Sequence, residues 1–137
     1  MLSKRSKYGI KAVLYIARQK AEHPVLASEI AERERIPHKF LEAILRDLVA
    51  AGILKSRRGR SGGYFLRKPK EQITFAEIMR VFDGPIALIP CVSENFYEAC
   101  PECADEKTCV IRKVFLRIRV ATLDILEESN VLKLLDE

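Results

Sequence analysis

Four cysteines within 19 residues are the groups in this chain best suited to hold a metal or a metal cluster. Their spacing is Cys91-x8-Cys100-x2-Cys103-x5-Cys109. Soft thiolates suit zinc and iron–sulfur centres alike, so ligand type alone leaves both open. The Cys100–Cys103 pair resembles half of a zinc knuckle, but no second CxxC follows. Four free, buried cysteines are unexpected in so polar a segment, which therefore predicts metal binding or redox sensing.

A second chemically distinctive stretch is the run Arg57-Arg58-Gly59-Arg60-Ser61-Gly62-Gly63-Tyr64. We expect a hairpin tip in which Gly62 and Gly63 supply the positive φ of a tight turn. The three arginines would put fixed cations on that tip, which suits a narrow anionic target such as a DNA groove. Tyr64 could donate to a phosphate, although a tyrosine in a strand more often packs. The alternative is a solvated turn, but such turns favour Asn, Asp and Ser over clustered Arg.

The segments before and after this tip predict a winged helix-turn-helix. Apolar spacing predicts helices over residues 7–20, 27–34 and 37–51. Ser28 is a candidate N-cap of the second helix, and Pro37 suits the first position of the third. Gly52 is expected to end the third helix in a left-handed conformation. Strands at 53–54 and 64–66 would then flank the arginine run.

In such a module the second helix of the helix-turn-helix enters the major groove by its first turns. Here those positions carry His38, Lys39 and Glu42, followed by Ala43 and Arg46. Lys39 can donate to guanine or phosphate, and Glu42 can accept from a cytosine amino group. We expect the apolar neighbours to face the core, and the cationic N-terminus to add phosphate contacts. The apolar set is Phe40, Leu41, Ile44 and Leu45, and the N-terminal cations are Lys4, Arg5 and Lys7.

Charge is divided unevenly along the chain. Residues 1–82 carry 18 Lys and Arg against 8 Asp and Glu, whereas residues 83–137 carry 6 against 11. A cationic first part predicts a polyanionic partner, with nucleic acid favoured over an anionic membrane surface. We expect no membrane span and no signal peptide, and hence a cytoplasmic protein.

The second part is dominated by one long predicted helix over residues 110–128. A capping box at Thr74 and Glu77 predicts a shorter helix before it. In the long helix one apolar seam contains Ile111, Phe115, Ile118, Thr122 and Ile125. A second apolar face contains Leu116, Val120 and Leu123. A helix apolar on two sides is either a fully buried core helix or a dimerisation helix, and we expect the dimer.

These features together resemble IscR/NsrR-type regulators of the Rrf-two (Rrf2) family, which are bacterial winged-helix transcription factors. The resemblance rests on Arg58-Gly59-x-x-Gly62-Gly63-Tyr64, on Phe40-Leu41-Glu42, and on cysteines placed before a long helix. It implies a homodimer on a partly palindromic double-stranded DNA operator, acting as a repressor and affecting RNA polymerase only indirectly. It also implies a [2Fe–2S] or [4Fe–4S] cluster that tunes DNA affinity.

By position, the resemblance assigns Cys91, Cys103 and Cys109 as three cluster ligands. The chain departs from the usual pattern in having a fourth cysteine, Cys100, and a longer first interval. Some members have a histidine three residues after the last cysteine, where this chain has Arg112. Because arginine is not an ordinary ligand, either Cys100 takes the fourth position or the fourth ligand comes from elsewhere.

The sequence therefore predicts a mainly α protein with a small β-hairpin, and a regulator rather than an enzyme. We expect a winged helix-turn-helix domain over 1–82, a cofactor loop over 83–109, and a dimerisation helix with a tail over 110–137. The competing hypothesis is a zinc-stabilised winged-helix regulator or protein-interaction adaptor without cluster sensing. A thiol-redox enzyme is disfavoured, because Cys100 and Cys103 lack the preceding strand of a thioredoxin-like unit and neither histidine makes a convincing base.

Overall fold

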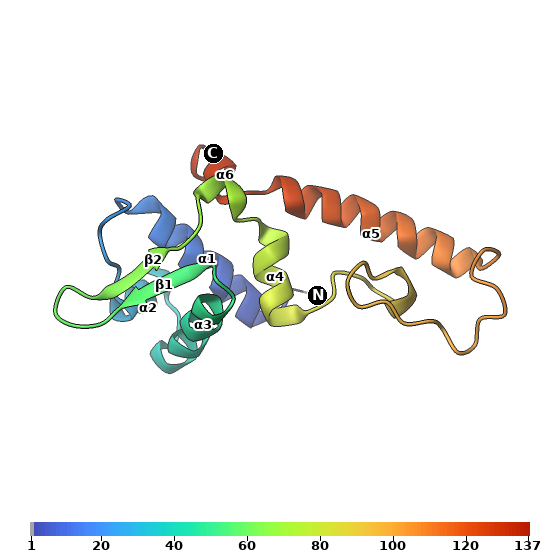
Figure 1. Cartoon of the computed structure of the whole chain (residues 1–137), viewed down its shortest axis with the longest axis horizontal. Coiled ribbons are helices and arrows are strands. Elements are labelled where there is room, and N and C mark those ends of the chain that lie inside the picture. The colour runs from blue at the N-terminus through green and yellow to red at the C-terminus, as the bar shows by residue number, and fades with distance from the viewer. Residues whose placement is uncertain (1) are drawn as a thin grey trace.

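Three helices and a two-stranded hairpin form one lobe of the molecule, and a long helix extends away from it (Figure 1). The computed structural model describes residues 2–137. Its architecture is mainly α with a small antiparallel hairpin, so the predicted fold class is confirmed. Among residues 2–137, no helix is long and apolar enough to cross a membrane. The elements in order are α1 (Lys4–Arg18), α2 (Ala27–Glu34), α3 (His38–Ala50), β1 (Leu54–Arg57), β2 (Gly63–Leu66), η1 (Lys70–Gln72), α4 (Phe75–Asp83), η2 (Pro90–Val92), α5 (Val110–Glu128) and α6 (Val131–Leu135).

The core of the lobe lies where α1 and α3 bury their apolar faces. Leu41, Ile44, Leu45 and Leu48 of α3 are buried against Val13 and its neighbours on α1. The helix-turn-helix is tight because Arg35 ends α2 in the left-handed region, at φ 55°. A non-glycine residue there is uncommon, and it lets the chain reverse within two residues before Pro37. Gly52 ends α3 with φ 78°, as predicted.

The predicted helix ends differ in detail from those observed. α1 begins earlier, because the Ser3 hydroxyl caps it by accepting from the Ser6 amide at 3.0 Å. Ser28 was wrongly expected as the N-cap of α2, since Leu26 occupies that position without a side-chain cap. Pro37 lies at the N-cap of α3 rather than at its first helical position. The capping hydrogen bond at Thr74 is confirmed, with the Glu77 amide donating to the hydroxyl at 3.2 Å.

The hairpin begins and ends close to the predicted positions, but its glycines act differently. Positive φ occurs at Gly59 and Gly63 and not at Gly62, where it was also expected. Gly62 is required for a different reason: a Cβ there would lie 2.2 Å from the Arg57 carbonyl oxygen. Backbone cannot yield as a flexible side chain can, so a larger residue would force the hairpin apart.

Helix α4 joins the lobe to the rest of the chain. Gly9 on α1 leaves room for the Phe82 ring, since a Cβ at Gly9 would lie 2.5 Å from that ring. The Asp83 carboxylate, at the end of α4, accepts from the buried Ser6 hydroxyl at 2.6 Å and from the Ser3 amide at 3.4 Å. The start of α1 and the end of α4 are therefore held together by packing and by hydrogen bonds.

The long helix spans the predicted residues 110–128, but only one of its faces packs on its own chain. Leu123 is buried and Leu116 is half-buried, whereas Val120, expected on the same face, is exposed. The fully buried alternative is therefore wrong. A short helix that was not predicted, α6, then brings Val131 back into the core, where the Val131 amide donates to the Ile73 carbonyl at 2.9 Å.

We predict that Asp83→Asn lowers stability at neutral pH by about 1 kcal/mol, because a charged acceptor is replaced by a neutral one. Burial alone would raise the pKa of Asp83, but the hydrogen bonds from Ser3 and Ser6 outweigh it and lower that pKa below its ordinary 3.8. The ionised carboxylate therefore stabilises the fold above roughly pH 4, and this contribution is lost as the pH falls through the lowered pKa.

Chemical denaturation of wild type and variant from pH 7 to pH 3 measures this effect. The stability gap between them should narrow toward the acid end. Asp124→Asn, on the exposed side of α5, is the matched control. A gap that stays constant with pH would contradict the assignment.

Candidate nucleic-acid interface and cysteine-lined cavity

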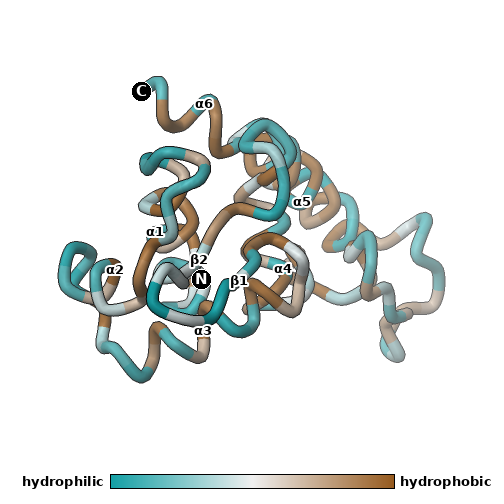
Figure 2. Tube along the Cα trace, turned by 60° about the vertical axis from the view of Figure 1, so that its left-hand side comes forward, coloured by the Kyte–Doolittle hydropathy of each residue, from teal (hydrophilic) through white to brown (hydrophobic). Residues whose placement is uncertain are grey.

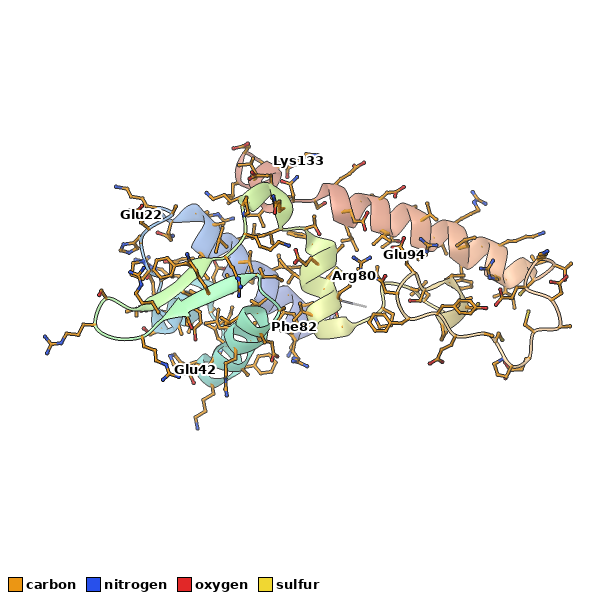
Figure 3. The ribbon with its side chains drawn as sticks, viewed as in Figure 1. Glu22, Glu42, Arg80, Phe82, Glu94 and Lys133 are labelled. Carbon is orange, nitrogen blue, oxygen red and sulfur yellow. The ribbon has the colours of Figure 1, made fainter. Side chains whose placement is uncertain are left out.

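Helix α3 presents a polar face to solvent at the outer side of the lobe. His38, Lys39, Glu42 and Arg46 are all exposed, and Glu42 projects from this helix in Figure 3. His38 Nδ1 lies 3.5 Å from Glu42 Oε1, so the two polar side chains interact one turn apart. The predicted major-groove residues thus share one accessible face, available for contacts to base edges.

Phe40 departs from the expectation that it faces the core. It is 39% exposed, and its ring meets that of Tyr8 edge to face at 5.7 Å between centroids. An exposed aromatic ring on the α3 surface adds an apolar contact element beside Lys39. Helical periodicity missed it because Phe40 lies at the border between the buried and exposed sides.

The hairpin tip carries exposed cations, as predicted, but only two of its arginines lie in the turn. Arg58 and Arg60 are in the loop between the strands and are exposed. Arg57 is the last residue of β1, and its guanidinium lies 5.0 Å from the centre of the Phe65 ring. Arg57 is therefore anchored to the hairpin, whereas Arg58 and Arg60 extend from it.

Tyr64 and Arg5 have partners within the fold. Tyr64 is half-buried, and its backbone exchanges hydrogen bonds with Val25 at 2.8 and 3.1 Å. Arg5 pairs with Asp47 at 2.8 Å and stacks over Phe82 at 5.4 Å. Both residues therefore help to hold elements of the lobe together, a role that residue type alone did not indicate.

The four cysteines line one cavity of about 440 Å³ beside the start of α5. Cys91, in η2, is buried; Cys103 and Cys109 are half-buried and Cys100 is exposed. Cys109 is the N-cap of α5, and its sulfur accepts from the Arg112 amide at 3.4 Å. A helix N-terminus favours negative charge, so this position suits a thiolate ligand. The sequence prediction that these residues belong together is supported by a common cavity.

Two of the thiols are held in their neutral form in this arrangement. The carboxylate of Glu102, 3.2 Å from the Cys100 sulfur, raises the pKa of that thiol through a hydrogen bond. Burial, followed by the nearby Cys109, raises the pKa of Cys103. Thiolate ligation at these positions therefore requires a bound cation to displace the protons.

The donor set of the cavity suits more than one kind of metal centre. Zn–S bonds are about 2.3 Å long, so thiolates around one tetrahedral zinc lie roughly 3.8 Å apart. Within residues 2–137, no three His, Cys, Asp or Glu side chains are grouped closely enough to hold one metal ion. Four thiols on one cavity match the ligands of a zinc site and of an iron–sulfur cluster alike.

Glu106, which sequence reasoning did not assign, also lines the cavity, and Tyr97 contacts it from outside the lining. The Tyr97 hydroxyl donates to the Glu106 carboxylate, and Glu106 lies 3.8 Å from Arg112 Nε. The hydrogen bond to Glu106 is the main reason that the pKa of Tyr97 is raised. Tyr97 and Glu106 thereby join two parts of the cysteine segment. In the sequence, the signal for this part of the wall was Arg112. It lies three residues after Cys109, where some family members have a histidine ligand.

Two arginines fasten the cysteine segment to the helices around it. Arg119 of α5 donates through Nε to the Val92 carbonyl at 2.9 Å. Arg80 of α4 lies 3.5 Å from Glu94 and 3.8 Å from Glu127 of α5, and Figure 3 shows Arg80 and Glu94 facing one another between α4 and α5. Through these contacts α4, α5 and the beginning of the segment form one connected unit.

One side of α5 is apolar and accessible, and its Ile118 also lines a cavity with Met79 of α4. Ile111, Val114, Ile118 and Ile125 are 64%, 48%, 40% and 64% exposed. They are spaced three, four and seven residues apart, so they lie along one side of the helix. Apolar residues recur along the whole of α5 in Figure 2. Of the predicted seam, Ile111, Ile118, Thr122 and Ile125 are exposed and Phe115 is half-buried, and Val114 is a further exposed apolar residue.

Comparison with known proteins agrees with this geometry. A family model described as "Iron-dependent Transcriptional regulator", that of the Rrf2 family, matches residues 2–137. An rrf2-like HTH-type transcriptional regulator of Rhodobacter capsulatus is 44% identical over 121 residues, which is 86% of this chain and 81% of that protein.

Two solved structures cover nearly the whole chain. The global cysteine regulator CymR of B. subtilis is 28% identical and aligns over 98% of this chain and 95% of its own, with a TM-score of 0.80. T. potens IscR is 25% identical and aligns over 99% and 86%, with a TM-score of 0.78. With a helix-turn-helix, a basic wing and full-length matches to such regulators, this chain belongs to the Rrf2 family of DNA-binding transcriptional regulators, which are not enzymes.

Proposed function

We propose that this regulator binds an operator through α3 in the major groove and through its wing in the flanking minor groove or on phosphates. His38, Lys39 and Glu42 occupy the exposed first turns of α3. Arg58 and Arg60 extend from the hairpin beyond the anchored Arg57. Side chains on α3 would read base edges, while the wing cations would add affinity that depends on salt. Tyr64 has a packing role here and is a weaker candidate for DNA contact.

We further propose a homodimer, formed through the apolar side of α5. An exposed stripe of three isoleucines and a valine over four helical turns is costly in water, and a second copy of the stripe would bury it. Two copies would place two α3 helices for a partly palindromic operator. A DNA-binding dimer of this kind would act in the cytoplasm.

The regulatory site of this proposal is the cysteine cavity. Cys91, Cys103 and Cys109 would hold an iron–sulfur cluster, with Cys100 as the fourth ligand. The observation that carries this proposal is the one cavity that all four cysteines line. When bound, such a cluster would supply a reversible response to iron, nitric oxide or redox state.

The chain itself would convert that response into a change in DNA affinity. Ligation by Cys91 and Cys109 would fix η2 and the first turn of α5 relative to each other. Release would free the segment between them and change the position of α5, and so the spacing of the two α3 helices in the dimer. Coupling of this kind is typically about 1–3 kcal/mol, equivalent to a roughly 5–150-fold change in affinity. We expect repression by the form that binds DNA more tightly.

The alternative is a winged-helix regulator or adaptor stabilised by zinc, with no cluster sensing. Ligation by the four cysteines would be common to both. The two forms differ in colour and in sulfide content, so visible absorption and sulfide quantitation separate them.

We predict that replacing both Arg58 and Arg60 by Gln weakens operator binding and lowers its salt dependence. Each neutralised phosphate contributes about 0.9 to the slope of log K against log salt, so the double variant should lose about 1.8. The measurement is fluorescence anisotropy on a duplex selected from a random DNA pool. Arg117→Gln, which removes an exposed cation from α5, should leave the slope unchanged. An unaltered slope in the double variant would mean that the wing does not contact phosphates.

We predict that Ile118→Glu converts the dimer to a monomer, since two buried carboxylates would face each other across the seam. Analytical ultracentrifugation gives the mass. Lys113→Glu introduces the same side chain outside the stripe and should remain dimeric. A wild-type monomer, or an Ile118→Glu variant of unchanged mass, would argue against this interface.

We predict that anaerobic reconstitution with ferrous iron and sulfide yields a brown protein that contains both elements. Cys91→Ser, Cys103→Ser and Cys109→Ser should each lose the colour, while Cys100→Ser should take up the cluster but lose it faster to a chelator. Visible absorption together with iron and sulfide quantitation checks this. A colourless wild type that contains zinc would establish the alternative instead.

A further inference from the structure

The buried Nε–H of Arg112 has no hydrogen-bond acceptor within the described residues. Its Nε is inaccessible to solvent and makes no hydrogen bond within the described residues. The side chain nevertheless lines the cavity that contains all four cysteines. A buried cationic donor without an acceptor is strongly unfavourable, and native folds rarely leave one in place.

The nearest carboxylate does not supply that acceptor. Glu106 Oε2 lies 3.8 Å from Arg112 Nε, which is beyond hydrogen-bond distance. Glu106 is already engaged, because the Tyr97 hydroxyl donates to its carboxylate. The guanidinium is thus held by a loose ion pair at the edge of the cavity, with its Nε–H unused.

Arg112 follows Cys109 by one helical turn at the start of α5. Its backbone amide already donates to the Cys109 sulfur at 3.4 Å. The side chain begins one helical turn after Cys109 and lies along the same cavity wall as Ile111. Within the described lining, Arg112 is the cation, and Glu98, Glu102 and Glu106 are carboxylates.

We propose that Arg112 is the cationic donor that holds the proposed cluster: its guanidinium group donates to a sulfur of the cluster or of a ligating thiolate. Arg112 is a positioning residue and not a ligand. A cluster bound by four thiolates is anionic and becomes more so on reduction, so a buried cation beside it favours retention and raises its reduction potential. This inference rests on the cluster proposed above and adds the residue that tunes it.

The test compares Arg112→Gln with Arg112→Lys in the full-length protein, each reconstituted anaerobically with ferrous iron and sulfide. Arg117→Gln, the same change at an exposed position on the same helix, is the matched control. The readouts are the midpoint potential from a dithionite titration followed by absorption and electron paramagnetic resonance, and the half-life of the cluster in a chelator. Circular dichroism of each variant verifies folding.

We expect Arg112→Gln to lower the ratio of reduced to oxidised cluster about tenfold at a fixed potential, which is 59 mV for a one-electron couple. Its cluster should also be lost several-fold faster. Arg112→Lys keeps the charge but lacks the Nε–H, so its values should lie between those of wild type and Arg112→Gln. Arg117→Gln should match wild type.

Two results would overturn the inference, and they are distinguishable. If the wild type binds iron and sulfide and Arg112→Gln has the same potential and half-life, the role of Arg112 is wrong and the cluster proposal stands. If the wild type takes up no iron and sulfide under these conditions, both proposals fail together. Should Arg112→Gln not fold, Arg112→Lys against wild type decides the question by the same two readouts.

Discussion

Helix α4 is the constraint on which the arrangement of this molecule depends. On one side it packs against α1 through Phe82, in the space that Gly9 leaves, and it is held there by the hydrogen bond between Asp83 and Ser6. On the other side Arg80 connects it to Glu94 and Glu127. The lobe that contains α3 and the cysteine segment are therefore both attached to this one helix.

This arrangement limits how a signal at the cysteines could reach α3. The cysteine segment is attached to α5 and η2, where Arg119 donates to the Val92 carbonyl, while α3 lies in the lobe with α4 between it and the segment (Figure 1). The cysteine segment therefore does not act on the recognition helix α3 by direct contact. What the segment can change is the orientation of α5, and in a dimer built on α5 that orientation sets the distance between two lobes. The proposed regulation thus requires the dimer, whereas DNA binding by a single lobe does not.

Features set by local interactions were predictable from the sequence. Helix α5 has its predicted bounds, because its apolar residues recur over five turns. Gly52 ends α3 and Thr74 begins α4, as their residue types indicate. Features set by contacts distant in the chain were not. Gly62 is required by the neighbouring backbone rather than by its own φ. Arg57 is anchored by Phe65 across the hairpin, and α6 is held in place by Val131, which is buried in the core.

The candidate site shows the same division. Residue type and spacing were sufficient to identify the four cysteines and the basic wing, because thiols and guanidinium groups are chemically distinctive wherever they lie. The partners that give these groups their properties come from other parts of the fold: Tyr97 reaches Glu106 across the loop, and Asp47 occupies Arg5. Pattern reasoning counts cations and ligands, but only the folded arrangement determines which of them are free to bind a partner.

The carboxylates that line the cavity affect an entering metal cation and an assembled cluster in opposite ways. Glu98, Glu102 and Glu106 line it together with the thiols, which favours entry of ferrous or zinc cations. The same carboxylates disfavour an assembled cluster, since its thiolate ligands and sulfides give it net negative charge. A zinc ion with four thiolates would also be anionic. A cofactor that fills the cavity must meet a cation there, and Arg112 is the described lining residue that supplies one.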